Sequence, residues 1–424
     1  MFQRRIERKL FKTIEDFRCV AITGARQVGK SYLLTRICRD QGGVYRTLDD
    51  PRVLEEANSD PLGWLRQNRR RGSLLVIDEA AKSPGIFSAV KVIVDEEDPV
   101  PTKIVLSSSG NYLLMRRIKE SLAGRVGLIQ LYTLSWSEIS KGVQSMISNL
   151  TEPDSIRPGA PSRITGIEID RSRENILTFG GFPEIQEKSD AGFLREWSNQ
   201  YFNTYILPMA VEFFSVTKQH SFQKVFYQLC LRTSNLLNYS DVATPSGISS
   251  VTVKNYIEYF SAMMLCFELP QFYLNPIKRL VKSPKIHIID PILINTGYGN
   301  VGSLTLQKNT GAIGSLYESW IVSELMKCAH NESIFPDFFT WHTQDGAEVD
   351  LVLRLQGKYV PIEIKYKKKL GKRDLSGLRS WLEVHDSETP AAYIVYTGRK
   401  FDQLSEKIWA VPDFLLLGAF DRQA

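Results

Sequence analysis

The sequence has few cysteines and no long apolar run. Its five cysteines among 424 residues are scattered and include no C-x-x-C pair, which excludes a disulfide framework and the common zinc-binding spacings. No stretch approaches the roughly 18 uncharged apolar residues that a membrane-spanning helix needs. These absences predict a soluble protein of the reducing cytoplasm with no membrane partner.

Neither sign of charge dominates. The 53 Lys and Arg against 47 Asp and Glu give a formal net charge of +6, which permits a polyanionic partner such as nucleic acid without requiring one. Apolar residues make up 43% of the chain, enough for packed cores. The length exceeds that of one compact domain, so several functions on one chain are possible.

The first 140 residues alternate short apolar runs with helical or polar stretches, which indicates a parallel α/β sheet with crossover helices. The expected buried strands are CVAIT (19–23), VYRTL (44–48), LLVID (74–78), KIVLS (103–107) and VGLIQL (126–131). The following stretch, 144–168, is polar and rich in Pro and Ser. It therefore predicts a linker or an exposed loop.

A phosphate-binding loop follows the first of these strands. The run AITGARQVGKSYLL fits G-x-x-x-x-G-K-[ST], between an apolar strand and a helical pattern, which is the context that this motif requires. Its glycines let successive N–H groups face the phosphates. Lys30 is expected to neutralise the β and γ phosphates, and the hydroxyl of Ser31 to bind Mg²⁺. The predicted nucleotide-binding residues are Gly24, Ala25, Arg26, Gln27, Val28, Gly29, Lys30 and Ser31.

A pair of acidic residues ends the third expected strand. Asp78 and Glu79 follow LLVI, and the carboxyl end of such a strand lies at the edge where an open α/β sheet binds ligands. We expect Asp78 to hold the magnesium ion through water and Glu79 to polarise the attacking water. Lys30, Asp78 and Glu79 are thus candidate catalytic residues.

Several motifs together resemble the AAA+ ATPases, specifically bacterial and archaeal ones that carry a domain of unknown function behind the motor. These motifs are GARQVGKS, LDDP, VIDE, SSSGNYLL, ESLAGRV, TLSWSE and GGFPE. The resemblance implies ATP as the nucleotide and a γ-phosphate sensor at Ser107 or Ser109. It also implies that Arg125 acts on the nucleotide of a neighbouring subunit, hence a homo-oligomer. The alternative for Arg125 is a cation that complements the dipole at a helix end.

The middle of the chain is mostly helical in its periodicity. The segment NYSDVATPSGISSVTVKNYIEYF (238–260) spaces small, turn and apolar residues as a helix-turn-helix does, with Ser249 or Ser250 as the cap of the second helix. The residues near the start of that helix could contact DNA. The alternative is a winged-helix fold used only for packing.

A second group of candidate residues lies near the C-terminus. The strands AEVDLVLRL (347–355) and KYVPIEIKY (358–366) form an expected hairpin at Gly357. Asp350 lies on the first strand, and Glu363 and Lys365 share one face of the second. With Glu318 on a preceding helix, they resemble the E, D, E-x-K pattern of the restriction-endonuclease-like fold. This resemblance implies a nuclease-like site for Mg²⁺ or Mn²⁺.

The predicted fold class is therefore α/β, with three domains. They are a P-loop (AAA+) ATPase domain (1–150), a helical and winged-helix connecting region (165–310) and a restriction-endonuclease-like domain (311–424). We expect an ATPase that couples nucleotide state to DNA binding or processing, with metal-dependent cleavage as an additional activity. One alternative is a nucleotide-dependent switch or scaffold that binds a protein partner and has an inactive nuclease-like domain. Another is a DNA-binding regulator that has lost ATP hydrolysis.

Overall fold

The computed structural model describes residues 2–96, 100–155, 166–188, 190–274, 282–299, 301–343 and 345–420. The chain divides into two compact units. The N-terminal unit comprises Arg4–Thr133 and Ala262–Met264, and the C-terminal unit consists chiefly of Leu134–Ser261 and Leu265–Ala424. The three-domain division stays a prediction.

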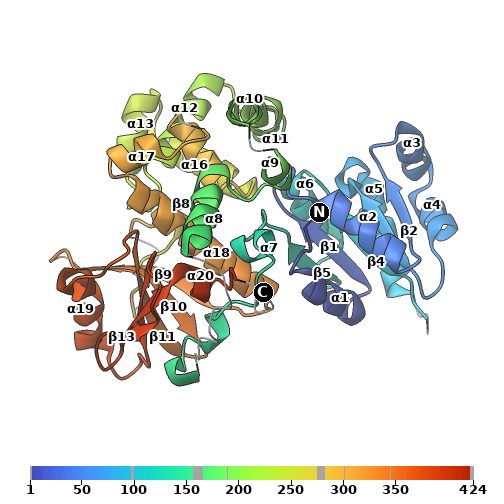
Figure 1. Cartoon of the computed structure of the whole chain (residues 1–424). Coiled ribbons are helices and arrows are strands. Elements are labelled where there is room, and N and C mark those ends of the chain that lie inside the picture. Colours follow the sequence, from blue (N-terminus) through green and yellow to red (C-terminus); the bar gives the residue numbers. More distant parts are fainter. Residues whose placement is uncertain are drawn as a thin grey trace. The chain divides into compact units, whose positions relative to one another are not determined.

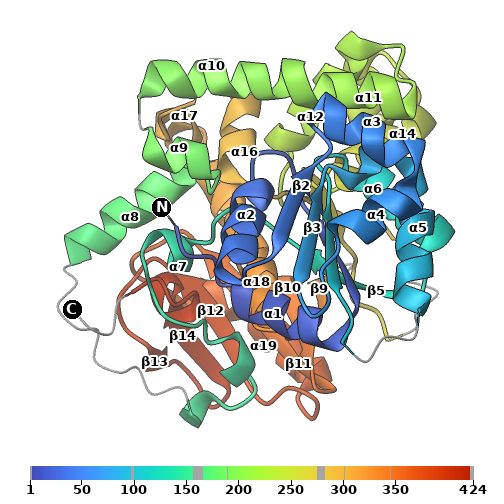
Figure 2. The same cartoon turned by 90° about the vertical axis from the view of Figure 1, so that its right-hand side faces the viewer.

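The N-terminal unit is built on a five-stranded parallel sheet in the order β2-β3-β4-β1-β5. Figure 2 shows α2 on one side of β2 and β3, with α4, α5 and α6 on the other. The strands are β1 (Cys19–Thr23), β2 (Val44–Thr47), β3 (Leu74–Asp78), β4 (Lys103–Ser107) and β5 (Val126–Gln130). The helices are α1 (Glu7–Asp16), α2 (Lys30–Asp40), α3 (Pro51–Ser59), α4 (Pro61–Asn68), α5 (Pro84–Asp95) and α6 (Asn111–Ser121).

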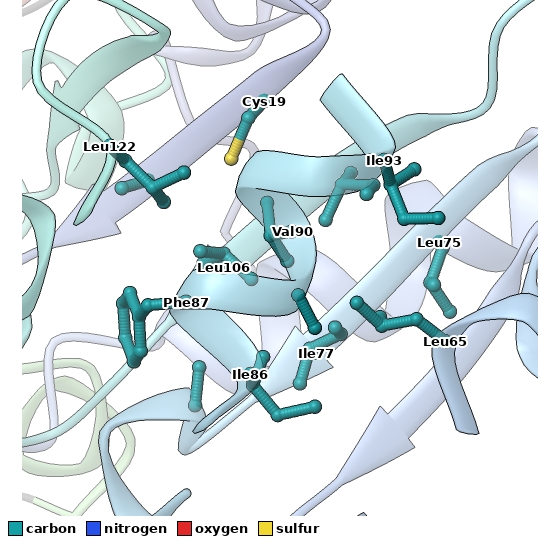
Figure 3. Packing of buried hydrophobic residues seen from close by; sticks show 14 of the residues in the cluster. Cys19, Leu65, Leu75, Ile77, Ile86, Phe87, Val90, Ile93, Leu106 and Leu122 are labelled. Atoms are coloured by element: carbon teal, nitrogen blue, oxygen red, sulfur yellow. The ribbon is translucent and has the colours of Figure 1, made fainter. Parts of the chain in front are cut away.

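One hydrophobic cluster joins this sheet to α5. The helix presents Ile86, Phe87, Val90 and Ile93 at helical spacing, and Figure 3 shows these side chains against those of the strands. Alternate residues of β1, β3 and β4 supply the sheet side of the cluster. Every residue of β1 and β3 is buried, as expected for central strands of a parallel sheet covered on both faces. Burying each large apolar side chain contributes about 1.5–3 kcal/mol. The cluster therefore stabilises the position of the strands, and with it the edge of the sheet at which the strands end.

A winged-helix arrangement occupies the middle of the C-terminal unit. A three-stranded sheet in the order β6-β8-β7 accompanies its helices, in the chain order α12 (Gln219–Leu231), β6 (Asn235–Leu236), α13 (Tyr239–Ser246), α14 (Ser250–Ala262), β7 (Cys266–Leu269) and β8 (Lys285–Ile288). Gly247 joins the two central helices with φ 67°, a conformation that favours glycine. The Ser249 hydroxyl caps α14 by accepting from the Thr252 N–H, which decides between the two expected caps.

The structure separates two expectations for Val251. The spacing of the segment counted it among the apolar residues of a helix-turn-helix, and its place near the start of the second helix made it a residue that could approach DNA. It is 71% exposed, so it is a surface residue and not a packing residue. Val251 lies in the first turn of α14, on the side away from the buried residues Val253, Tyr256 and Ile257. The start of α14 is therefore a surface that a partner can reach.

The last part of the C-terminal unit is a six-stranded mixed sheet in the order β13-β14-β12-β11-β10-β9, shown in orange and red in Figure 1. Its elements are α18 (Ile313–Asn331), β9 (Asp337–His342), β10 (Glu348–Leu355), β11 (Lys358–Lys365), α19 (Ser376–His385), β12 (Ala392–Tyr396), β13 (Asp402–Gln403), β14 (Ile408–Pro412) and α20 (Asp413–Leu416). β10 and β11 are antiparallel and joined by Gln356 and Gly357, both with positive φ. This geometry is typical of a type I′ hairpin turn, and it confirms the expected hairpin.

The C-terminal unit contains further helices besides those already named. They are α7 (Trp136–Ile139), α8 (Gly166–Phe179), α9 (Pro183–Glu187), α10 (Ala191–Tyr201), a π-helix (Phe202–Ile206), α11 (Leu207–Phe214), α16 (Pro291–Gly297) and α17 (Thr305–Asn309). A buried ion pair connects α8 to α20. Arg173 donates to both oxygens of Asp413, which also accepts from the Tyr317 hydroxyl. Because both charges are buried, this two-pronged pairing offsets their desolvation.

The segment 144–168 is not wholly the exposed loop that its composition predicted. Ile147 and Leu150 are fully buried, and the Met146 N–H donates to the Leu416 carbonyl in the last helix. The burial of these two apolar side chains favours docking of this stretch in spite of its polar composition. Residues 156–165 lie outside the described part of the chain.

Candidate functional site

The loop between β1 and α2 has the backbone conformation of a phosphate cradle. Gly24 has φ 156°, and a Cβ there would lie 2.4 Å from the Leu131 carbonyl oxygen, so only glycine fits without a shift. Gln27 and Gly29 also have positive φ, 63° and 94°. Arg26, Gln27 and Ser31 are exposed, whereas Ala25 and Val28 are buried. The loop therefore presents one polar face to solvent at the N-terminus of α2, where backbone N–H groups favour an anion.

Lys30 lies beneath this loop. Its ammonium donates to the carbonyl oxygens of Gly24 and Ala25, each at 2.8 Å, and the residue is only 6% exposed. Burial lowers the pKa of Lys30 to about 8, and the negative charges of Glu79 and Asp78 oppose that shift. A phosphate group would give this ammonium the anionic partner that two neutral carbonyls do not supply.

Arg4 holds the same loop from outside the motif. The residue is 8% exposed, and its guanidinium donates to the carbonyl oxygens of Val28 at 2.8 Å and of Tyr132 at 2.7 Å. It thus ties the phosphate loop to the segment that follows β5. Sequence reasoning missed this residue because nothing in the motif points to a partner more than 20 positions upstream.

Asp78 is at the carboxyl end of β3 and is 3% exposed. Its carboxylate accepts from the Tyr45 hydroxyl at 2.6 Å and from the Ser107 hydroxyl. Burial and then the hydrogen bond to Asp78 raise the pKa of Tyr45, while hydrogen bonds to Thr35 and Ser31 oppose the shift. Asp78, Ser107 and Ser31 therefore share one neighbourhood at the edge of the sheet. Tyr45 was not predicted as part of it.

Glu79 is held by the loop that follows β4. Its carboxylate accepts from the Ser109 N–H at 2.9 and 3.1 Å, from the Ser109 hydroxyl at 3.1 Å and from the Ser108 hydroxyl at 3.2 Å. Glu79 also has a left-handed backbone, with φ 56°, a conformation that is costly outside glycine and clusters at functional sites. The two sensor candidates thus contact different acids, Ser107 contacting Asp78 and Ser109 contacting Glu79.

Arg125 lies just after α6, beyond the left-handed Gly124. Its guanidinium pairs with Asp95 at the end of α5, with an N–O distance of 2.6 Å, and both side chains are more than a third exposed. An exposed pair of this kind contributes little to stability. The guanidinium is therefore at the surface of the N-terminal unit, and its action on a second subunit stays a prediction.

The four C-terminal candidates come together. Lys365 Nζ lies 2.5 Å from Glu363 Oε1 and 3.7 Å from Asp350 Oδ2, and that Asp350 oxygen also accepts from the Ile364 N–H at 2.8 Å. Glu318, on α18, approaches the same group of side chains through a lysine that it shares with Asp350. The spacing of two residues between Glu363 and Lys365 therefore does direct both side chains to one cluster.

Sequence reasoning missed that shared lysine, Lys285 of β8. Its ammonium lies 2.9 Å from Glu318 and 3.6 Å from Asp350, and it also pairs with Glu348. In the sequence, Lys285 belongs to the run IKRLVKSPKIHIID (277–290), where it forms a modest basic strip with Lys278, Arg279 and Lys282 that could simply be a solvated face. Lys285 is instead 3% exposed, while Lys278 and Arg279 of the strip lie outside the described residues.

Burial dominates the protonation behaviour of this cluster. It raises the pKa of both Glu318 and Glu363 to about 8, with a further rise from the charge of Asp350, while Lys285 and Lys365 oppose the shifts. At neutral pH these two glutamates therefore hold a proton far more often than ordinary carboxyl groups do.

A family model described as "AAA domain" matches residues 16–140. We therefore call the region that this model matches, residues 16–140, the AAA domain. The strand order, the glycine loop and the acidic end of β3 are all within this match. The remainder matches two families described only as domains of unknown function, DUF8612 over residues 170–301 and DUF4143 over residues 313–414.

Two curated relatives extend well beyond the AAA domain. Uncharacterized protein Rv2008c of Mycobacterium tuberculosis is 25% identical over 95% of this chain and 82% of its own length. Uncharacterized protein MJ1544 of Methanocaldococcus jannaschii is 24% identical over 74% of this chain and 68% of its own. Among solved structures, the Walker-type ATPase PABY2304 of Pyrococcus abyssi aligns with a TM-score of 0.44 at 14% identity, covering 70% of this chain and 96% of that one. This structural likeness is too weak to carry an argument.

The two expected metal sites differ in how well their side chains suit a cation. In the AAA domain, the Asp78 carboxylate and the Ser31 hydroxyl are hard oxygen donors that suit Mg²⁺. In the C-terminal cluster, the carboxylates already face two ammonium groups. Over the described ranges, no group of three or more His, Cys, Asp or Glu side chains is arranged to hold a metal ion. The C-terminal residues as arranged do not fit a divalent ion.

The structure also bears on the expected absence of a membrane partner. Among the helices that it describes, none combines the length and the apolar character needed to cross a bilayer.

Proposed function

We propose that this chain binds and hydrolyses ATP in its AAA domain and couples the nucleotide state to DNA binding. The observation that carries the ATPase part is the convergence of Lys30, Asp78 and Glu79 at the carboxyl edge of the parallel sheet. In an open α/β sheet this edge is where ligands bind. ATP, rather than another nucleotide, is proposed from the AAA resemblance.

Each side chain has a distinct role in this proposal. The loop N–H groups and Lys30 bind the phosphates, and Ser31 with Asp78 would hold Mg²⁺, which supplies charge neutralisation when bound. Glu79 accepts a proton from the attacking water. Ser107 or Ser109 senses the γ-phosphate, and each already contacts one of the two acids. A movement of Ser107 would therefore change a contact of Asp78, and a movement of Ser109 would change a contact of Glu79.

The DNA part of the proposal rests on the winged-helix arrangement. The first turns of α14 present Val251, Lys254 and Asn255 to solvent, in the helix that reads the major groove in helix-turn-helix proteins. A cation and an amide at that position can contact phosphates and base edges.

Replacing these two polar side chains should weaken DNA binding. We expect Lys254→Ala/Asn255→Ala to bind a short duplex about tenfold or more weakly than wild type, since it loses one phosphate contact and one base-edge contact. Fluorescence anisotropy with labelled duplex at two salt concentrations measures this. The control is Lys224→Ala, an equally exposed lysine on the neighbouring helix α12.

The outcomes separate the proposal from its rivals. Equal binding by wild type, the double variant and the control would contradict a role for α14. Failure of the wild type to bind DNA, with ATP turnover intact, would favour the switch or scaffold that binds a protein partner.

Assembly completes the proposal. We propose a cytoplasmic homo-oligomer in which Arg125 reaches the nucleotide of the next subunit.

Metal-dependent DNA cleavage by the C-terminal unit is a separate candidate function and not part of this proposal. The convergence of Glu318, Asp350, Glu363 and Lys365 favours it, and Lys285 at the same place opposes it. Loss of DNA integrity that requires Glu363 and added Mg²⁺ or Mn²⁺ would establish it.

A further inference from the structure

Lys285 enters the C-terminal carboxylate cluster from another part of the C-terminal unit. It begins β8, the middle strand of the winged-helix sheet, and it pairs there with Leu236 of β6 and Leu269 of β7. Its side chain is 4% exposed, yet the ammonium meets Glu318, Glu348 and Asp350. The fold itself therefore determines the position of Lys285, because a central strand holds its backbone and three carboxylates lie around its ammonium group.

We propose that the Lys285 ammonium is the resident cation of this cluster and stands where the nuclease resemblance calls for a divalent metal ion. The inference goes beyond the ATPase and DNA-binding proposal and depends on neither. It assigns the C-terminal cluster as a metal-independent ion-pair site that links the winged helix to the nuclease-like sheet.

The donor atoms support this assignment. Asp350 uses Oδ2 to accept from the Ile364 N–H at 2.8 Å, and its Oδ1 faces Lys285 at 3.6 Å. Glu363 Oε1 pairs with Lys365 at 2.5 Å. Ammonium groups thus face both carboxylates that a metal would need. A metal ion ligated by those oxygens at the usual ~2.0–2.6 Å would lie against a like charge.

One carboxylate oxygen in the cluster has no hydrogen-bond partner. Glu363 Oε2 is buried and unsatisfied within the described residues. Mg²⁺ usually keeps several waters and binds one or two carboxylates, so this oxygen could take part in a metal site only if the ammonium groups of the cluster moved away. Lys285 cannot simply move into water, because its stem is buried and its backbone is paired on both sides.

Removing Lys285 should create the metal site that the wild type lacks. We would titrate the full chain with Mn²⁺, without nucleotide or DNA, and follow free Mn²⁺ by electron paramagnetic resonance. The variants are wild type, Lys285→Met and Lys285→Met/Glu318→Gln. Lys368→Met, which removes an exposed lysine that pairs with Asp170, is the matched control, and thermal melts report folding.

The expected result is Mn²⁺ binding at least about tenfold tighter in Lys285→Met than in wild type, because a like charge is gone. The Glu318→Gln change should reverse that gain, and the control should match wild type. Folded Lys285→Met without any gain would overturn the proposal, and so would tight binding of Mn²⁺ by wild type that Glu363→Gln abolishes. If Lys285→Met does not fold, the wild-type titration alone decides. No outcome here depends on ATP turnover or DNA affinity, so the two proposals fail separately.

Discussion

Glu79→Gln should lower ATP turnover by about 10²–10⁴-fold while ATP binding persists, since general-base catalysis typically contributes that much. The amide has the size of the carboxylate, and its oxygen can still accept from the Ser109 N–H and hydroxyl that now hold Glu79. The left-handed backbone at this position is unchanged by the substitution. The variant therefore removes the base but keeps the hydrogen bonds and the backbone conformation at this position.

Single-turnover hydrolysis and binding of a fluorescent ATP analogue measure the two effects separately. Glu55→Gln is the matched control, because Glu55 is an exposed glutamate on α3 of the same unit. Turnover that survives in Glu79→Gln would contradict the assigned role. Wild-type protein that binds ATP without hydrolysing it would support the DNA-binding regulator that has lost catalysis.

Arg125→Ala should lower turnover by about 10³-fold at concentrations where the protein assembles, the lower end of what an arginine supplied to a transferring phosphate contributes. In one chain the Arg125 guanidinium pairs with the exposed Asp95, 2.6 Å away, and donates a long hydrogen bond to the Ala123 carbonyl. Asp95→Ala removes that pair but keeps the guanidinium, so it should leave turnover intact or raise it. If Arg125→Ala lowers turnover and Asp95→Ala does not, the loss cannot come from breaking the ion pair, because both variants break it.

Turnover per chain against protein concentration, with sedimentation of the same samples, tests the oligomer. We expect wild-type turnover per chain to rise as the assembly forms. Concentration-independent turnover that Arg125→Ala does not change would leave Arg125 as a surface cation near the end of α6, complementing the helix dipole.

The fold of the AAA domain was largely predictable because its signals are local. Five strands were expected from short apolar runs, and three of them, β1, β3 and β4, have the expected bounds, while β2 and β5 end one residue earlier. A parallel strand that is buried on both faces has a nearly continuous run of apolar residues, which can be recognised directly in the sequence. The glycine loop is local as well, since its whole motif lies within the eight residues 24–31.

The parts that escaped prediction are contacts between distant residues. Arg4 reaches Val28 and Tyr132, and Lys285 reaches Glu318 and Asp350. A lone arginine or lysine looks the same in a sequence whether it is solvated or buried, because the acids or carbonyls that decide its position come from other segments. Asp350, Glu363 and Lys365 could be grouped only because a hairpin and a spacing of two residues brought them together.

The most direct test of the central claim is ATP hydrolysis with Mg²⁺ by wild type and Lys30→Ala, with and without linear DNA. Lys91→Ala, an exposed lysine on α5, is the control. We predict that wild type and control hydrolyse ATP, that DNA changes their rate, and that Lys30→Ala loses about 10²–10³-fold in rate, as expected when a preorganised positive charge at the phosphates is removed. Absence of turnover in wild type, or equal turnover in Lys30→Ala, would contradict the ATPase assignment, and a rate indifferent to DNA would contradict the coupling.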